Sequence, residues 1–172
     1  MTSAVSKGQF IVVKGFSRIQ IALHWGVAAL ILFNLLMDNG LGQLLRQIQQ
    51  GGMATTTTIA WAHIIAGSLV LALVLWRLAL RFTRGVPAAP EGESRMLRLA
   101  GEAGHVALDA LMIALPVTGL LAWYGGVTAR ADLPGGVLKV LLWIVIIGHV
   151  VAALYHQFIL RDGLVNRMRK AG

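Results

Sequence analysis

The sequence predicts an all-α integral membrane protein, built as a bundle of four transmembrane helices with both termini in the cytoplasm. The composition is the first observation: 57% of the 172 residues are hydrophobic and only 13% are charged, whereas charged residues make up about a quarter of a soluble domain. The second is that the few charges leave four long apolar stretches. The third is the uneven distribution of Lys and Arg.

Each apolar stretch is close to the roughly 20 residues that a helix needs to cross a bilayer. The predicted helices span Ile19–Met37, Ile59–Leu80, His105–Trp123 and Leu138–Leu160. Helices are the expected spanning form, because lipid offers no hydrogen bonds to an exposed backbone. No internal repeat is visible, so residues 1–172 are expected to form one domain.

The basic residues predict the orientation. Twelve of the 15 Lys and Arg residues lie in the N-terminal tail, in the C-terminal tail, or around the connection between the second and third stretches. Only Arg46, Arg130 and Lys139 lie on the opposite side. Since basic residues concentrate on the cytoplasmic side of a membrane, both termini are expected there. The basic residues flank helices without forming one patch, so lipid is an expected partner and nucleic acid is not.

The first two stretches each contain one histidine. In the first, "FSRIQIALHWG" places Arg18 just before the membrane and His24 about one and a half turns inside it. The second contains His63, with Gly67 one turn later, where a glycine would let a flat ring approach the backbone. Arg77, near the end of this stretch, is expected to extend to the inner membrane surface.

The third and fourth stretches contain the other three histidines. His105 begins the third, and Asp109 lies one turn later on the same face. That pair is either a proton relay or a mutual hydrogen bond that stabilises packing. The fourth stretch contains His149 and His156, two turns apart.

All five histidines therefore lie inside or at the edge of the membrane, where ionisable groups are costly and usually functional. Structural zinc sites usually add thiolates, and the chain has no cysteine. Proton relays need carboxylates, and only Asp109 lies well inside a stretch. Haem fits better, because its iron takes axial imidazoles from facing helices and its propionates favour basic residues. A packing role stays open for any single histidine.

Depth along the helices gives a first choice of partners. His24 lies about 9 Å from the cytoplasmic start of its helix, while His156 and His149 lie about 6 Å and about 16 Å from the inner end of theirs. Depth alone slightly favours His156 as the partner of His24. His63 is the one histidine clearly in the outer half.

Four segments carry a resemblance to a known family. They are "SRIQIALHW", "HIIAG", "IALPVTGL" and "GHVVAALYHQFILRDGLVNRM", one on each predicted helix. In order and spacing they resemble the bacterial cytochrome b561 family, which is similar to the cytochrome b subunits of hydrogenases and formate dehydrogenases. The resemblance implies a four-helix bundle with two stacked haems b, ligated by one histidine each from the first two helices and by two from the fourth.

The resemblance assigns metal-ligand roles to His24, His63 and His149, with His24 and His149 as the inner pair. It leaves His156 and His105 beside the haem or on the quinone side, while Arg18 is a candidate partner of a haem propionate. The family's second ligand on the fourth helix lies fourteen residues before the first. Here that position is Gly135, so the outer haem lacks a ligand. It is then absent, held by His63 alone, or completed by another group, such as Met53 or a partner subunit.

The resemblance also implies a function. It is electron transfer to or from the quinone pool in a bacterial inner membrane, through haem b, as a relay or as a subunit of a respiratory complex. Ubiquinone, a redox partner subunit and a second copy of the chain are the expected partners. A stand-alone superoxide:ubiquinone oxidoreductase is one alternative. A haem-poor structural or assembly subunit is another, and a proton or metal transporter is a third.

Overall fold

The computed structural model describes residues 15–37, 58–87, 93–124 and 134–171, and most of these residues lie in long helices. Three of the helices are α1 (Arg18–Leu36), α3 (Thr58–Arg84) and α4 (Arg95–Tyr124). The fourth is α5 (Lys139–Tyr155), which continues into π-helical turns on both sides, so that the whole helical span runs over Gly136–Leu160. All four are long and apolar enough to cross a membrane. The predicted fold class, an all-α four-helix membrane protein, is thus confirmed, while the single domain stays a prediction.

Local sequence sets the start of α1. Ser17 caps the helix: its hydroxyl accepts a hydrogen bond from the Gln20 amide (3.3 Å), and the Gln20 side chain accepts one from the Ser17 amide (2.9 Å). This capping box satisfies amides that would otherwise lack partners at the helix end. The Gln20 side chain also donates to the Gly85 carbonyl (3.3 Å), which ties the start of α1 to the end of α3.

The end of α3 lies beyond the predicted Leu80. The helix continues to Arg84, and Gly85 comes next with a φ of 75°, a left-handed conformation that favours glycine. Its amide donates to the Arg81 carbonyl (3.1 Å), which closes the last turn.

The start of α4 is where the boundary prediction was wrong. The helix begins at Arg95, ten residues before the predicted His105, so Arg95 and Arg98 belong to the helix and not to a loop. The Ser94 hydroxyl accepts from the Leu97 amide (3.3 Å) and caps this early start. Arg95, Arg98 and Glu102 interrupt the apolar run here, so these turns resembled a connection.

The chain folds back on itself after α5. Arg161 has a φ of 51° and Gly163 a φ of 75°, and these left-handed residues turn the chain away from the helix axis. The next element is a short 3₁₀ helix (Val165–Met168). We call residues 161–171 the C-terminal segment. The Trp25 indole donates to the Met168 carbonyl (3.0 Å), so this segment is attached to α1.

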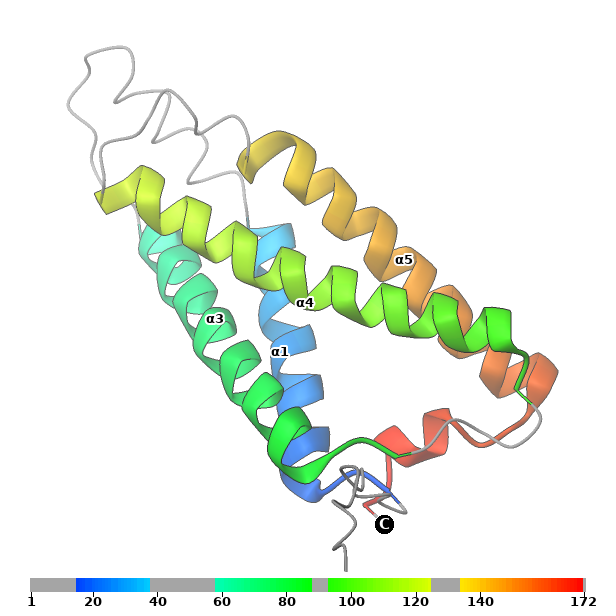
Figure 1. Ribbon diagram of the computed structural model, residues 1–172. Helices are drawn as coiled ribbons and strands as arrows, with labels where there is room; N and C mark the ends of the chain where they lie inside the picture. Colours follow the sequence, from blue (N-terminus) through cyan, green and yellow to red (C-terminus); the bar gives the residue numbers. More distant parts are fainter. Residues whose placement is uncertain (1–14, 38–57, 88–92, 125–133, 172) are drawn as a thin grey trace, which may run out of the picture.

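The helices pack in chain order, α1 on α3, α3 on α4 and α4 on α5. In Figure 1, α1 and α3 run side by side, and α4 and α5 diverge from them toward the end where the C-terminal segment lies. The core between α1, α3 and α4 consists of Val27, Val70, Val74 and Met112. Most other apolar side chains are exposed, as expected for helices that face lipid.

We call the end of the bundle where α1 and α4 begin and α3 and α5 end the basic end. Its described basic residues are Arg18, Arg81, Arg84, Arg95, Arg98, Arg161, Arg167, Arg169 and Lys170. The described parts of both terminal regions lie there (Figure 1). This agrees with the expectation that both termini lie on the same side of the membrane.

Candidate functional site

Three imidazoles from three helices meet toward the basic end. His24 of α1 and His149 of α5 have ring centres 6.3 Å apart, with an angle of 57° between the ring planes. His105 of α4 has its ring centre 5.2 Å from that of His149, in an edge-to-face arrangement. The histidines of α1 and α5 therefore approach each other although these two helices are not consecutive in the packing order. We call His24, His105 and His149 the imidazole cluster.

The separation of His24 and His149 is that of two ligands on one metal ion. Metal–nitrogen bonds to histidine are about 2.0–2.1 Å long, so two imidazoles on opposite sides of a metal have ring centres about 6.4 Å apart. Each ring can turn about its own metal–nitrogen bond, so the observed angle of 57° is compatible with this arrangement. In addition, His24 Nδ1 is buried and has no hydrogen-bond partner among the described residues. A buried polar atom of this kind is costly unless it has a ligand.

His105 differs from this pair. Its Nδ1 lies 2.7 Å from the Gly101 carbonyl oxygen, one turn earlier on α4, so this nitrogen donates a hydrogen bond to the backbone. Its ring is too close to that of His149 for the two to be opposite ligands of one metal. The edge-to-face contact instead limits how the His149 ring can rotate.

Arg77 is a half-buried residue of α3, which sequence reasoning expected to extend to the membrane surface. The helix continues seven residues beyond it to Arg84, which places Arg77 about 10 Å inside the basic end. The signal available in the sequence was its spacing, since fourteen residues put Arg77 on nearly the same helix face as His63.

Asp109 lies next to this arginine. Its Oδ2 is 3.8 Å from a guanidinium nitrogen of Arg81, whereas its buried Oδ1 has no hydrogen-bond partner among the described residues. Asp109 also acts electrostatically on Arg77 and His105. The described contact of Asp109 is therefore with Arg81 of α3, whereas the His105 ring bonds to its own helix.

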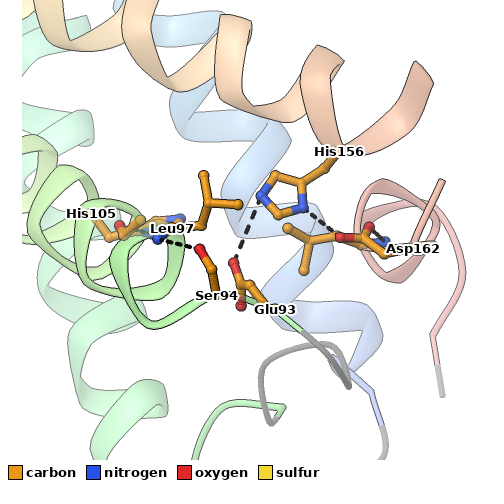
Figure 2. Close-up of polar contacts among 8 residues, drawn as sticks. Glu93, Ser94, Leu97, His105, His156 and Asp162 are labelled. Carbon is orange, nitrogen blue, oxygen red and sulfur yellow. Dashed lines mark hydrogen bonds and ion pairs between the residues drawn. The ribbon is translucent and has the colours of Figure 1, made fainter. Parts of the chain in front are cut away.

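His156 lies apart from the cluster, between two carboxylates (Figure 2). Its Nδ1 is 2.5 Å from Asp162 Oδ2, and its Nε2 is 3.8 Å from Glu93 Oε1. Partial burial raises the pKa of Asp162, but the hydrogen bonds with His156 and with the Leu164 amide outweigh this and lower it. Both ring nitrogens of His156 thus face acidic groups of the C-terminal segment and of the residues before α4.

His63 lies near the opposite end of the bundle. The Asn34 side chain of α1, with its amide oriented to satisfy both contacts, donates to the His63 carbonyl (3.3 Å) and accepts from the Gly67 amide (3.0 Å). Ten residues separate His24 from Asn34 on α1, so this contact is about 15 Å farther along the helix. Gly135 lies in the π-helical turn before α5, and Met53 lies outside the described residues.

The remaining predicted residues lie near the imidazole cluster or near His63. Arg18 is the exposed first residue of α1, and its predicted contact with a propionate stays a prediction. Trp25 packs its ring edge-to-face against His24, with ring centres 5.3 Å apart. At the far end, Trp61 packs against Trp123, with ring centres 6.2 Å apart.

Comparison with known proteins gives this geometry a family. The sequence profile of the prokaryotic cytochromes b561 matches residues 15–171. The chain belongs to the prokaryotic cytochrome b561 family. A cytochrome b562 of Cereibacter sphaeroides is 32% identical over 162 residues, which cover 91% of this chain and 96% of that protein. A probable superoxide oxidase, CybB, of Yersinia pestis is 25% identical over 178 residues, which cover 90% of this chain and 96% of that protein.

Membership in the cytochrome b561 family makes the chain a multi-pass membrane cytochrome of the b type and implies haem b as its cofactor. The residues present fit this group: the rings of His24 and His149 have the separation of two ligands of one iron, and His24 has a buried nitrogen with no hydrogen-bond partner in the described parts of the chain. No group of three or more His, Asp or Glu side chains in the described parts of the chain has the geometry of a metal site. A pair of imidazoles suits haem, which supplies the other four ligands of its iron.

Proposed function

We propose that this cytochrome moves single electrons to or from the quinone pool of a bacterial inner membrane, through one haem b held between His24 and His149. The observation that supports the proposal is the 6.3 Å separation of the two ring centres. The family match supports the electron-transfer role. Both termini are on the cytoplasmic side in this proposal. Lys and Arg concentrate on the cytoplasmic side of a membrane, so the basic end, where both terminal regions lie, faces the cytoplasm.

The residues of the cluster have distinct roles in this proposal. His24 and His149 would hold the haem iron between them, and the iron would then have no free position for oxygen. Haem b supplies a one-electron redox couple when it is bound. His105 orients the His149 ring through its edge-to-face contact and is itself fixed by the Gly101 carbonyl. His63 remains a candidate for a second haem, for which Gly135 supplies no imidazole.

In this proposal the quinone reacts at the basic end of the bundle. Reduction of a quinone consumes protons, and His156, Asp162 and Glu93 form a group that can exchange them near the membrane surface. Ubiquinone is the proposed quinone. Electrons come from a redox partner subunit, or pass between two copies of the chain.

The test is a spectrum of the purified protein. A reduced-minus-oxidised difference spectrum is expected to show a sharp b-type band, with one haem extracted per chain. Addition of ubiquinone to the reduced protein should remove the band. A colourless preparation from haem-replete cells would contradict the proposal and favour a structural subunit. Two haems per chain would contradict the single site.

A second candidate function is a superoxide:ubiquinone oxidoreductase, and the resemblance to the probable superoxide oxidase of Yersinia pestis favours it. In that reaction two superoxide ions each give up one electron and become oxygen, and ubiquinone accepts the two electrons and two protons to become ubiquinol. The purified protein alone would then reduce ubiquinone when superoxide is generated around it. A relay or subunit would instead do so only with its partner present.

A further inference from the structure

The C-terminal segment crosses the basic end of the bundle. It leaves the helical span of α5 after Leu160 and turns back toward α1, as the red part of the chain in Figure 1 shows. The helices that it joins carry His24 and His149, but α1 and α5 are not neighbours in the packing order. The segment therefore lies on the basic side of the place where these two imidazoles meet.

Buried polar contacts attach the segment to the end of α5. Asp162 Oδ2 lies 2.5 Å from His156 Nδ1, and Asp162 Oδ1 accepts a hydrogen bond from the Leu164 amide (3.0 Å). Glu93 Oε1 is 3.8 Å from the other ring nitrogen of His156. The side chains of His156 and Glu93 are only 8% and 9% exposed. Ionisable side chains at a helix end are covered this well only when other parts of the chain fold over them and pair with them.

The second attachment of the segment lies beside a proposed haem ligand. The Trp25 indole donates to the Met168 carbonyl (3.0 Å), and the Trp25 ring packs against His24, with ring centres 5.3 Å apart. Between the two attachments the segment has an apolar inner side and a polar outer side. The half-buried apolar residues are Leu164, Val165 and Met168, and the exposed polar ones are Asn166, Arg169 and Lys170.

A bend with two left-handed residues begins the segment. Arg161 has a φ of 51° and Gly163 a φ of 75°. Glycine adopts this conformation freely, whereas a residue with a side chain does so at a cost. Apart from its chain neighbours, no atom lies within 4 Å of the position that a Cβ would take at Gly163. A methyl group at Gly163 would thus oppose the bend without meeting any other side chain.

We propose that the C-terminal segment is a lid on the aqueous side of the haem site. The inference rests on the proposed function. The bend at Arg161 and Gly163 is the hinge of the lid, and the contacts of Asp162 and Met168 hold it closed. The closed lid keeps water-soluble oxidants and reductants away from the iron, while quinone reaches the site from the bilayer. Lids of this kind separate a reaction from water, and here the lid directs the electron to quinone.

The first experiment measures the opening of the lid in the full-length protein. The chain has no cysteine, so Met168→Cys places a single thiol on the inner side of the lid, and Lys170→Cys places one on the outer side. Addition of Gly163→Ala should make a water-soluble maleimide label Met168→Cys about tenfold faster, because the left-handed backbone then disfavours the closed form. Labelling of Lys170→Cys should not change. The control is Gly136→Ala, the same substitution at another glycine with open space around it, and it should change neither rate.

The second experiment measures access to the haem. Ferricyanide takes one electron from each reduced haem and becomes ferrocyanide, so the loss of the reduced b-type band follows the reaction. Gly163→Ala should be oxidised about tenfold faster than the unaltered protein, since only the open form reacts. Haem content and oxidation by ubiquinone should be unchanged, and Gly136→Ala should match the unaltered protein. If labelling of Met168→Cys becomes faster but oxidation by ferricyanide does not, the segment does not cover the haem and the inference is overturned.

Proteolysis tests the lid if Gly163→Ala fails to fold or fails to open it. Trypsin cleavage after Arg167 of the unaltered, haem-loaded protein separates Met168 from the chain and removes the attachment to α1. Arg169 and Lys170 are lost as well, and the lower positive charge would by itself slow an anionic oxidant. Faster oxidation by ferricyanide after cleavage therefore indicates an opened lid, whereas an unchanged or slower rate overturns the inference.

Failure of the inference and failure of the proposed function give different results. A protein that has the spectrum of two axial imidazoles, and that ferricyanide oxidises equally fast before and after cleavage, refutes only the inference. A protein that binds no haem refutes the proposed function and the inference together.

Discussion

The two ends of the bundle each contain histidine, and they use it differently. At the basic end, α1, α4 and α5 bring three imidazoles together. At the other end, His63 is one histidine among packing contacts, with Asn34 bonded to its carbonyl and to the Gly67 amide. The first end has a buried nitrogen, His24 Nδ1, with no hydrogen-bond partner among the described residues, while the described contacts of the second are those of two helices that pack closely.

The position of a histidine in a membrane helix therefore does not define its role. Buried imidazole is costly at both ends. The basic end differs because two imidazole rings from different helices, those of His24 and His149, lie at a distance that one metal ion can bridge. Substitutions at the two ends should accordingly have unequal effects on haem.

His149→Ala should remove the haem from the basic end, whereas His63→Ala should leave it bound. Loss of an axial ligand removes a metal bond and opens a cavity in the site, so we expect haem content to fall at least tenfold in His149→Ala. Haem extracted per chain measures the effect. If both variants lost the same amount of haem, the proposed difference between the two ends of the bundle would be wrong.

His156→Ala should destabilise the C-terminal segment without loss of haem. The variant loses the hydrogen bond with Asp162 and the ion-pair contact with Glu93, and a hydrogen bond to a charged group contributes roughly 1.5–3 kcal/mol. Trypsin should cleave at Arg167 and Arg169 faster than in the unaltered protein. Loss of haem in His156→Ala, with haem retained in His149→Ala, would favour the pairing of His24 with His156.

The same contact predicts a dependence on pH. A carboxyl group whose pKa is lowered on folding, as for Asp162, stabilises the fold above its ordinary pKa of 3.8 and loses this contribution as the pH falls through the lowered value. The C-terminal segment should therefore stay attached at neutral pH and loosen only in strong acid. Hydrogen exchange of the Leu164 amide, compared with Asp162→Asn, measures this. Loosening already near neutral pH would contradict it.

Trp25→Phe should have a smaller effect. Phenylalanine keeps an aromatic ring beside His24 but cannot donate to the Met168 carbonyl. The loss of one neutral hydrogen bond is about 0.5–1.5 kcal/mol. Cleavage of the C-terminal segment should increase less than in His156→Ala, and the haem spectrum should be unchanged.

Gly67→Ala should be close to neutral. An added methyl group would lie 3.6 Å from the Asn34 side chain, an ordinary contact. Haem content and thermal stability should both match those of the unaltered protein. A loss of haem would indicate that a macrocycle lies against Gly67, and would give His63 a cofactor.

The fold could be predicted from the sequence because apolar length alone decides which segments span a membrane. The four helices are predicted on this basis, and the family resemblance reached from the quoted segments is confirmed by the profile match. The start of α4 could not be predicted in the same way. Its first turns carry Arg95 and Arg98 and depend on the cap at Ser94, a local hydrogen bond that hydropathy does not reveal.

The candidate site could be predicted in part. The resemblance pointed to His24 and His149, whereas depth favoured His156. The depth estimate counts residues along a straight helix. It takes no account of how the chain folds beyond the end of the helix. The turn after α5 brings Asp162 back to His156, and no helical spacing indicates that contact.

An experimental density map of the haem-loaded protein tests the central claim most directly. We expect a porphyrin between α1 and α5, with its iron bonded to the rings of His24 and His149. Iron on His156 or His63 alone, or only side chains and lipid between His24 and His149, would contradict it.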